Sequence, residues 1–122
     1  HGMDVYLSDS DGIGNYIING FPWNDFLGGQ SNFRSFNMIY PGTEGPIETI
    51  QWEGLREAVD DVRYATLLRQ LATKAIATGK VDNIYQGRLA LLWLETLDAK
   101  TADLNAVRME MISYILKLKS LL

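Results

Sequence analysis

The chain of 122 residues contains no cysteine and a single histidine, His1. Disulfide bonds and thiol chemistry are therefore excluded, as are histidine-based catalytic triads and metal sites that need several histidines. The lack of cysteine does not decide the compartment, because a secreted protein need not contain disulfides. No apolar run approaches the roughly 18 residues that a membrane span requires, so we expect no transmembrane segment.

Basic residues are too few to make a positive surface. The net charge is −4 and the pI is about 4.8, which argues against nucleic acid or an anionic membrane as a partner. With 47% hydrophobic and 21% charged residues, the chain should be globular and form one domain. It is too short for a complete (β/α)₈ barrel, which needs about 250 residues.

Composition divides the chain into two unlike parts. Residues 1–48 hold 6 of the 15 acidic residues, 8 of the 13 aromatic residues and only one base, Arg34. Residues 49–122 hold 9 acids and 10 bases and have a helical pattern throughout. We therefore predict a strand and loop segment at 1–48 and a helical segment at 49–122. Binding groups concentrate on loops with a rigid support, which favours the first part as the place of function.

Short strands are predicted in the first part. Residues 3–7 alternate in polarity, residues 14–19 are rich in β-formers, and residues 36–40 end at Pro41, which cannot continue a ladder. Residues 21–32 would form a loop that is long for a compact domain, which suggests a functional loop or a missing partner surface.

Three helices are predicted in the second part. Thr49 is a good N-cap for the first, Gly79 a natural stop, a second helix covers about 82–98, and Thr101 caps the third. The positions expected to face inward recur at spacings of three and four and are Leu55, Ala58, Val62, Ala65, Leu68, Ala72, Ile76, Ile84, Leu91, Leu94, Leu97, Leu104, Val107, Met111, Ile115, Leu118 and Leu122. Short connections favour antiparallel neighbours, so we predict an α+β fold, mainly helical, with two or three N-terminal strands and an antiparallel three-helix bundle.

Residues 38–64 form the most distinctive stretch of the chain. A strand ends in Tyr-Pro-Gly, a Gly-Pro follows four residues later, and a charged amphipathic helix then begins. The stretch resembles the C-terminal part of glycoside-hydrolase-like proteins that carry the domain of unknown function 4091, akin to glycoside hydrolase family 123. The family pattern is Ser-Ile-Arg-x-Glu-x-x-Arg-x-Gly-x-x-Asp-x-x-Tyr. Thr49, Glu53, Arg56, Asp61 and Tyr64 match or nearly match this pattern, whereas Gln51 replaces its arginine and Ala58 its glycine.

The resemblance implies that the chain is the end of a TIM-like barrel followed by C-terminal helices. It also implies that the catalytic residues lie on strands outside these 122 residues, so the chain alone would be an inactive fragment of a carbohydrate-active enzyme. No catalytic residue, metal or cofactor is assigned to it. Its expected partners are carbohydrate and the missing N-terminal portion or a second copy, and the resemblance implies a secreted or periplasmic setting. The alternative is a stand-alone helical module for protein interaction, with no enzymatic role.

Trp23, Asn24 and Asp25 resemble the aromatic loop that follows a late barrel strand in this family. An indole face can stack on the apolar face of a sugar, while the neighbouring amide and carboxylate and Tyr40 can bond its hydroxyls. We predict a sugar subsite from Trp23, Asn24, Asp25 and Tyr40. The alternative is that Trp23 packs between the loop and the helices.

Two acidic groups have more ordinary interpretations. Glu53, Arg56, Asp60 and Asp61 have the spacing of surface ion pairs, with Arg56 bonded to Glu53 or Asp60, and we expect them to be structural. Residues 9–12 read Asp-Ser-Asp-Gly, but the glycine comes too early for a calcium loop and no glutamate closes it. A tight turn is the favoured interpretation there.

Overall fold

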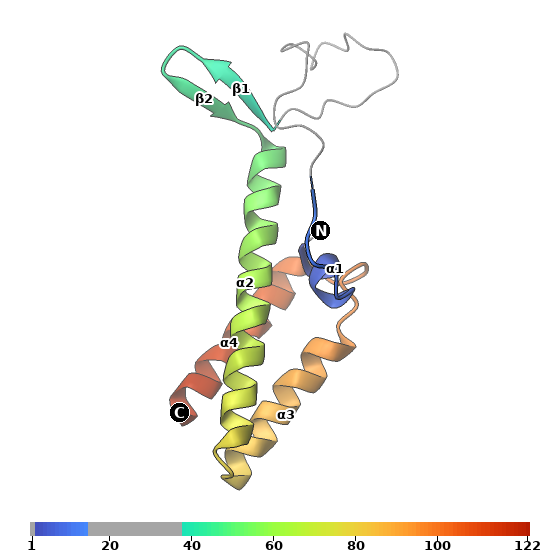
Figure 1. Cartoon of the computed structure of the whole chain (residues 1–122), viewed down its shortest axis with the longest axis vertical. Coiled ribbons are helices and arrows are strands. Elements are labelled where there is room, and N and C mark those ends of the chain that lie inside the picture. Colours follow the sequence, from blue (N-terminus) through green and yellow to red (C-terminus); the bar gives the residue numbers. More distant parts are fainter. Residues whose placement is uncertain (1, 15–37) are drawn as a thin grey trace.

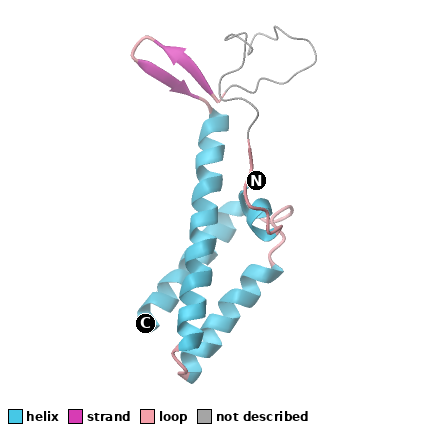
Figure 2. Cartoon of the chain, viewed as in Figure 1, coloured by secondary structure: helices cyan, strands magenta, loops and turns pink. Residues whose placement is uncertain are grey.

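The computed structural model describes residues 2–14 and 38–122. Within them the order of elements is α1 (Gly2–Leu7), β1 (Ile39–Gly42), β2 (Gly45–Glu48), α2 (Ile50–Ala77), α3 (Val81–Thr96) and α4 (Leu104–Leu121). The described part of the chain is mainly helical, as predicted, with one two-stranded antiparallel sheet (Figures 1 and 2). The predicted strand at 14–19, apart from residue 14, and the predicted loop at 21–32 lie outside the described residues.

The long helix α2 organises the other elements. α3 runs back along its C-terminal half, and α4 crosses behind it, so that successive helices alternate in direction (Figure 1). The hairpin of β1 and β2 extends from the N-terminal end of α2, away from the packed helices. We use "helical unit" below for α2, α3 and α4 together.

The start and stop of α2 follow local rules. The Thr49 hydroxyl accepts a bond from the Trp52 N–H at 3.3 Å and donates one to the Met38 carbonyl at 2.8 Å. The predicted cap is therefore confirmed, and it also ties the helix to the base of the hairpin. After Ala77 the chain turns through Gly79, whose φ of 72° lies in the left-handed region that glycine adopts without strain.

The core lies where the three long helices meet. α4 contributes Val107, Met111, Ile115 and Leu118, all predicted to face inward, while α3 contributes Ala90 and Leu94. Three of the five buried positions of α2 are alanines, and the five are Asp61, Ala65, Leu68, Ala72 and Ala75. Small side chains let α2 and α3 approach closely. The predicted inward residues Ile84, Leu91 and Leu97 are only half-buried, because α3 turns the face of Asn83, Gly87, Ala90 and Leu94 towards the core.

The predicted strand at 3–7 is wrong, because these residues form α1. Met3 is buried and Tyr6 and Leu7 pack beside it, and this spacing of three and four lets one face of a short helix rest on α2. A six-residue segment carries both the alternating and the helical pattern, so its period alone cannot distinguish them. The contact with α2 selects the helix.

Both strands and the start of α4 also differ from the prediction. β1 continues through Pro41 to Gly42, where Pro41 lies opposite Pro46. A two-stranded sheet has open edges on both sides, so a residue without an N–H is tolerated there. β2 was not predicted at all. The cap of α4 is Asp103 rather than Thr101, since the Asp103 carboxylate accepts from the N–H groups of Asn105 and Ala106.

Candidate functional site

The residues predicted to contact sugar are mostly outside the described part of the chain. Trp23, Asn24 and Asp25 fall in 15–37, whereas Tyr40 lies on β1 opposite Ile47 and is half-buried. Of the four, the structure therefore places only Tyr40. It lies one residue beyond the base of the hairpin, where Ile39 pairs with Glu48.

A groove lies between α1 and the N-terminal half of α2, and is here called the α1–α2 groove. Its volume is about 1030 Å³. One wall comes from α1 and the turn that follows it, up to Ile13, and the other from Leu55, Ala58, Val59 and Val62 of α2. Leu55, Ala58 and Val62 were predicted to face a core. They are half-buried because α1 covers this part of α2 only in part.

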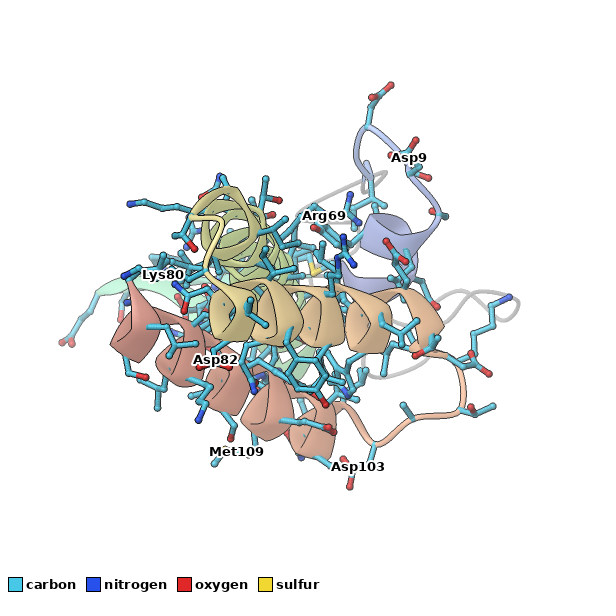
Figure 3. All side chains as sticks on the ribbon, turned by 90° about the horizontal axis from the view of Figure 1, so that it is seen from below. Asp9, Arg69, Lys80, Asp82, Asp103 and Met109 are labelled. Atoms are coloured by element: carbon cyan, nitrogen blue, oxygen red, sulfur yellow. The ribbon has the colours of Figure 1, made fainter. Side chains whose placement is uncertain are left out.

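Close backbone contact holds α1 against α2. Gly2 is buried beside Ala58, and a Cβ at Gly2 would collide with the Ala58 carbonyl oxygen. The Tyr6 hydroxyl donates to the Ala65 carbonyl at 3.4 Å. The Arg69 guanidinium lies 5.3 Å from the centre of the Tyr6 ring, between α2 and α1 (Figure 3), which is a cation–π geometry. These contacts fix one wall of the groove.

The acidic end of the groove is a turn. The Ser8 hydroxyl donates to the Val5 carbonyl at 3.0 Å and lies 2.8 Å from the Ser10 hydroxyl. Asp9 has a φ of 56° and its side chain is exposed on the loop beyond α1 (Figure 3). The segment forms a tight bend, as expected. In the described ranges no group of three His, Cys, Asp or Glu side chains could hold a metal ion.

An ion pair with a buried carboxylate joins α2 to α4. The Asp61 carboxylate is buried and accepts two bonds from Arg108, from Nε at 2.7 Å and from Nη2 at 3.2 Å. The hydrogen bond that Arg108 donates to Asp61, together with the nearby charges of Asp61 and Glu57, raises the pKa of Arg108 despite its partial burial. Arg108 thus stays charged. A bidentate pair of this kind fixes the position of α4 along α2.

Asp61 was expected among surface ion pairs with a structural role, but it is buried and its partner is Arg108 of α4. A signal was available, because Asp61 is spaced three and four residues from Ala58 and Ala65, on the inward stripe of α2. The pair Glu53–Arg56 does form, at 2.6 Å, but Asp60 pairs with Arg63 at 3.2 Å instead of with Arg56. Both of these pairs are exposed.

Apolar side chains make up most of the walls of the α1–α2 groove, and the charged residues Asp9, Asp11, Arg63, Arg69 and Glu95 also line it. Comparison of the chain with protein-family models, with curated proteins and with solved structures finds no match. No helix in the described ranges is both long and apolar enough to cross a membrane.

Proposed function

We propose that this chain is a supporting, non-catalytic C-terminal part of a carbohydrate-active, glycoside-hydrolase-like enzyme. The observation that carries the proposal is the hairpin of β1 and β2, which extends from the N-terminal end of α2, away from the helical unit (Figure 1). All four residues of β2 are exposed, and Ile47 and Ile50 are 57% and 88% exposed. An isolated two-stranded hairpin is at best marginally stable in water. A further surface against the hairpin, such as the end of a barrel, would stabilise it.

The resemblance of residues 38–64 to the end of that family's barrel supports the same proposal. Asp61, which matches the family's aspartate, pairs with Arg108 and so anchors α2 to α4. Gln51, in place of the family's arginine, and Glu53 lie at the end of α2 nearest the hairpin. The helical unit would then act as a rigid support that holds the hairpin and the loop before it against the barrel.

In this proposal Trp23 supplies the main contact with a sugar ring, and Asn24, Asp25 and Tyr40 bond its hydroxyls. Residues 1–48 carry six acids and one base, so a neutral or amino sugar fits better than an anionic one. The expected role of this chain is substrate contact and support. The acid–base chemistry would come from other strands.

The decisive experiment uses the enzyme that contains this chain. Trp23→Ala should raise KM or lower kcat on a glycoside and leave the melting temperature nearly unchanged. Trp93→Ala is the matched control, because Trp93 packs against Tyr114 with ring centres 5.3 Å apart and belongs to the helical unit. It should lower the melting temperature. Unaltered kinetics for Trp23→Ala together with a lowered melting temperature would assign Trp23 to packing and contradict the proposed subsite.

The α1–α2 groove favours a second candidate, a helical module that binds an apolar segment of another protein. Hydrogen exchange at the hairpin amides distinguishes the two. In the first case Gly42–Ile47 exchange fast in the isolated 122-residue chain and slowly in the enzyme. Slow exchange in the isolated chain would mean that the hairpin needs no barrel, and would favour the interaction module.

A further inference from the structure

Each strand of the hairpin contains one proline, and the two prolines lie directly opposite each other. β1 reads Ile-Tyr-Pro-Gly, β2 reads Gly-Pro-Ile-Glu, and Pro41 pairs with Pro46. Proline has no backbone N–H, so it cannot donate a hydrogen bond to a neighbouring strand. Its effect on a sheet depends on whether the missing N–H would point between the two strands or outward from an edge.

The hydrogen bonds of the hairpin show that the missing N–H groups would point outward. In an antiparallel pair of strands, opposed residues alternate between pairs that exchange both of their hydrogen bonds and pairs whose N–H and C=O groups point away from the partner strand. At the base of the hairpin the Thr49 N–H donates to the Met38 carbonyl at 3.1 Å, so this pair is of the bonded kind. The pair of Pro41 and Pro46 lies three steps further along the same register, and is therefore of the outward kind.

Both edges of the sheet consequently lack a donor. The outward positions are Ile39 and Pro41 on β1, and Pro46 and Glu48 on β2. A strand added to either edge would meet one N–H where it needs two, with a proline ring in place of the other. Proline on an edge strand is one of the means by which proteins prevent pairing with a further strand. Among the described residues, the sheet has only its two strands.

We propose that Pro41 and Pro46 close both edges of the hairpin, so that neither its own protein nor another chain extends it with a further strand. In a barrel each strand is bonded to neighbours on both sides, so β1 and β2 would lie beside a barrel and not within its sheet. Any partner of the hairpin then packs on one of its faces. The two prolines have this effect whether or not the chain belongs to the proposed enzyme.

Replacing both prolines by alanine tests the proposal in the 122-residue chain. The double variant Pro41→Ala, Pro46→Ala gains two outward N–H groups and loses the apolar atoms of two rings, so stronger association could not result from added apolar area. Sedimentation equilibrium should show an association constant at least about tenfold above that of the wild-type chain. Each single variant opens one edge and should have a smaller effect.

Ile47→Ala is the matched control. It also removes apolar atoms from the hairpin, but Ile47 lies opposite Tyr40 in a pair of the bonded kind, so the edges keep their groups. Its association should not exceed that of the wild-type chain. An NMR contact between the Hα atoms of Ile39 and Glu48 verifies the hairpin in every variant, because only pairs of the outward kind bring these atoms so close.

Three results would overturn the proposal. The first is a close Hα contact between Tyr40 and Ile47 in place of the one between Ile39 and Glu48, since the prolines would then face inward. The second is a double alanine variant that keeps the hairpin and associates no more than the wild-type chain. The third needs no variant, and is protection of the Ile39 and Glu48 N–H groups from hydrogen exchange when the wild-type chain is concentrated. None of these results depends on sugar binding, so the closed edges and the proposed enzyme role can fail independently.

Discussion

Asp61 is a buried carboxylate, and its bonded partner is the Arg108 guanidinium. Moving an ionised group out of water costs several kcal/mol, which a bidentate partner offsets only while both members are present. The nearby Glu57 lies 3.7 Å from the same guanidinium and is largely exposed, so it adds little. The Asp61–Arg108 pair therefore fixes the position of α4 on α2 more than it adds to the free energy of unfolding.

We expect Asp61→Ala to lower the free energy of unfolding by about 3 kcal/mol, because it leaves Arg108 without its partner inside the interface. Asp60→Ala, one residue away, removes only the exposed pair with Arg63 and should cost less than about 1 kcal/mol. Urea denaturation of the two variants measures the difference. Equal losses would mean that Asp61 is solvated.

At the scale of elements, the approach of α3 to α2 depends on a glycine. A Cβ at Gly87 would lie 2.7 Å from the Ala72 carbonyl oxygen and 2.8 Å from Ile76 Cγ1. The Ile76 side chain can move, but the carbonyl belongs to the backbone of α2 and cannot move without shifting the helix. Gly54 also lies within a helix, but a Cβ added there would meet no other atom within 4 Å.

Gly87→Ala and Gly54→Ala should therefore change stability in opposite directions. Gly54→Ala should stabilise by up to about 1 kcal/mol, as alanine does inside a helix. Gly87→Ala should destabilise by about 1–3 kcal/mol, because the close contact outweighs that gain. Thermal melts give the sign directly. Stabilisation by Gly87→Ala would show that α2 and α3 leave room for a Cβ at this position, which would contradict the close contact.

The connection between α3 and α4 is ordered by Asp98. Its carboxylate accepts from the Lys100 N–H at 3.0 Å and the Thr101 hydroxyl at 2.9 Å. These two bonds, with the nearby Lys100 charge, lower the pKa of Asp98 although the side chain is exposed. Thr101, which the sequence suggested as the cap of α4, serves this turn instead.

We expect the Asp98 carboxyl to titrate below the ordinary aspartate range in a carbon-detected NMR titration. Because its folded pKa is lowered, its stabilising effect is full above the unfolded pKa and is lost as the pH falls through the folded pKa. Asp98→Asn should remove this part of the acid sensitivity. A titration midpoint at or above the ordinary aspartate value would contradict the two hydrogen bonds.

At the scale of the whole molecule, one core holds α1 and the three long helices together. Met3, Leu68, Leu94, Met111 and Leu118 are its large, fully buried members and come from all four helices. The hairpin contributes none of the buried core residues. The helical unit and α1 should therefore unfold together, while the hairpin opens at lower cost.

Leu94→Ala and Ile115→Ala should each lower the free energy of unfolding by about 2–5 kcal/mol, as removal of a buried side chain does. Leu91→Ala should cost less, since Leu91 is only half-buried. Helices account for more than half of the 122 residues, so circular dichroism reports their unfolding. Tryptophan fluorescence should show the same unfolding transition. Two separated transitions would mean that the core is divided.

The sequence by itself determined the three long helices and most of their inward faces. Thr49, Gly79 and the stripe from Val107 to Leu118 act through neighbours on the same helix, within a few residues. The cap of α4 is Asp103 rather than the predicted Thr101, a shift of two residues. The acidic turn after α1 was likewise predictable from its own residues. Of the predicted sugar subsite, the structure places only Tyr40.

Only the tertiary structure decided the features that depend on distant residues. Residues 3–7 became a helix because α2 offers Met3 and Tyr6 a surface, and Asp61 became buried because Arg108, 47 residues later, meets it. β2 formed because Ile39–Gly42 pairs with it, although its own residues are poor strand formers. α3 has apolar residues on two sides, so its sequence does not decide which side faces the core. The side with Gly87 does so, because only glycine fits against the backbone of α2 there. Packing between separate elements outweighs a short local pattern, because each long-range contact contributes as much free energy as several residues of intrinsic preference.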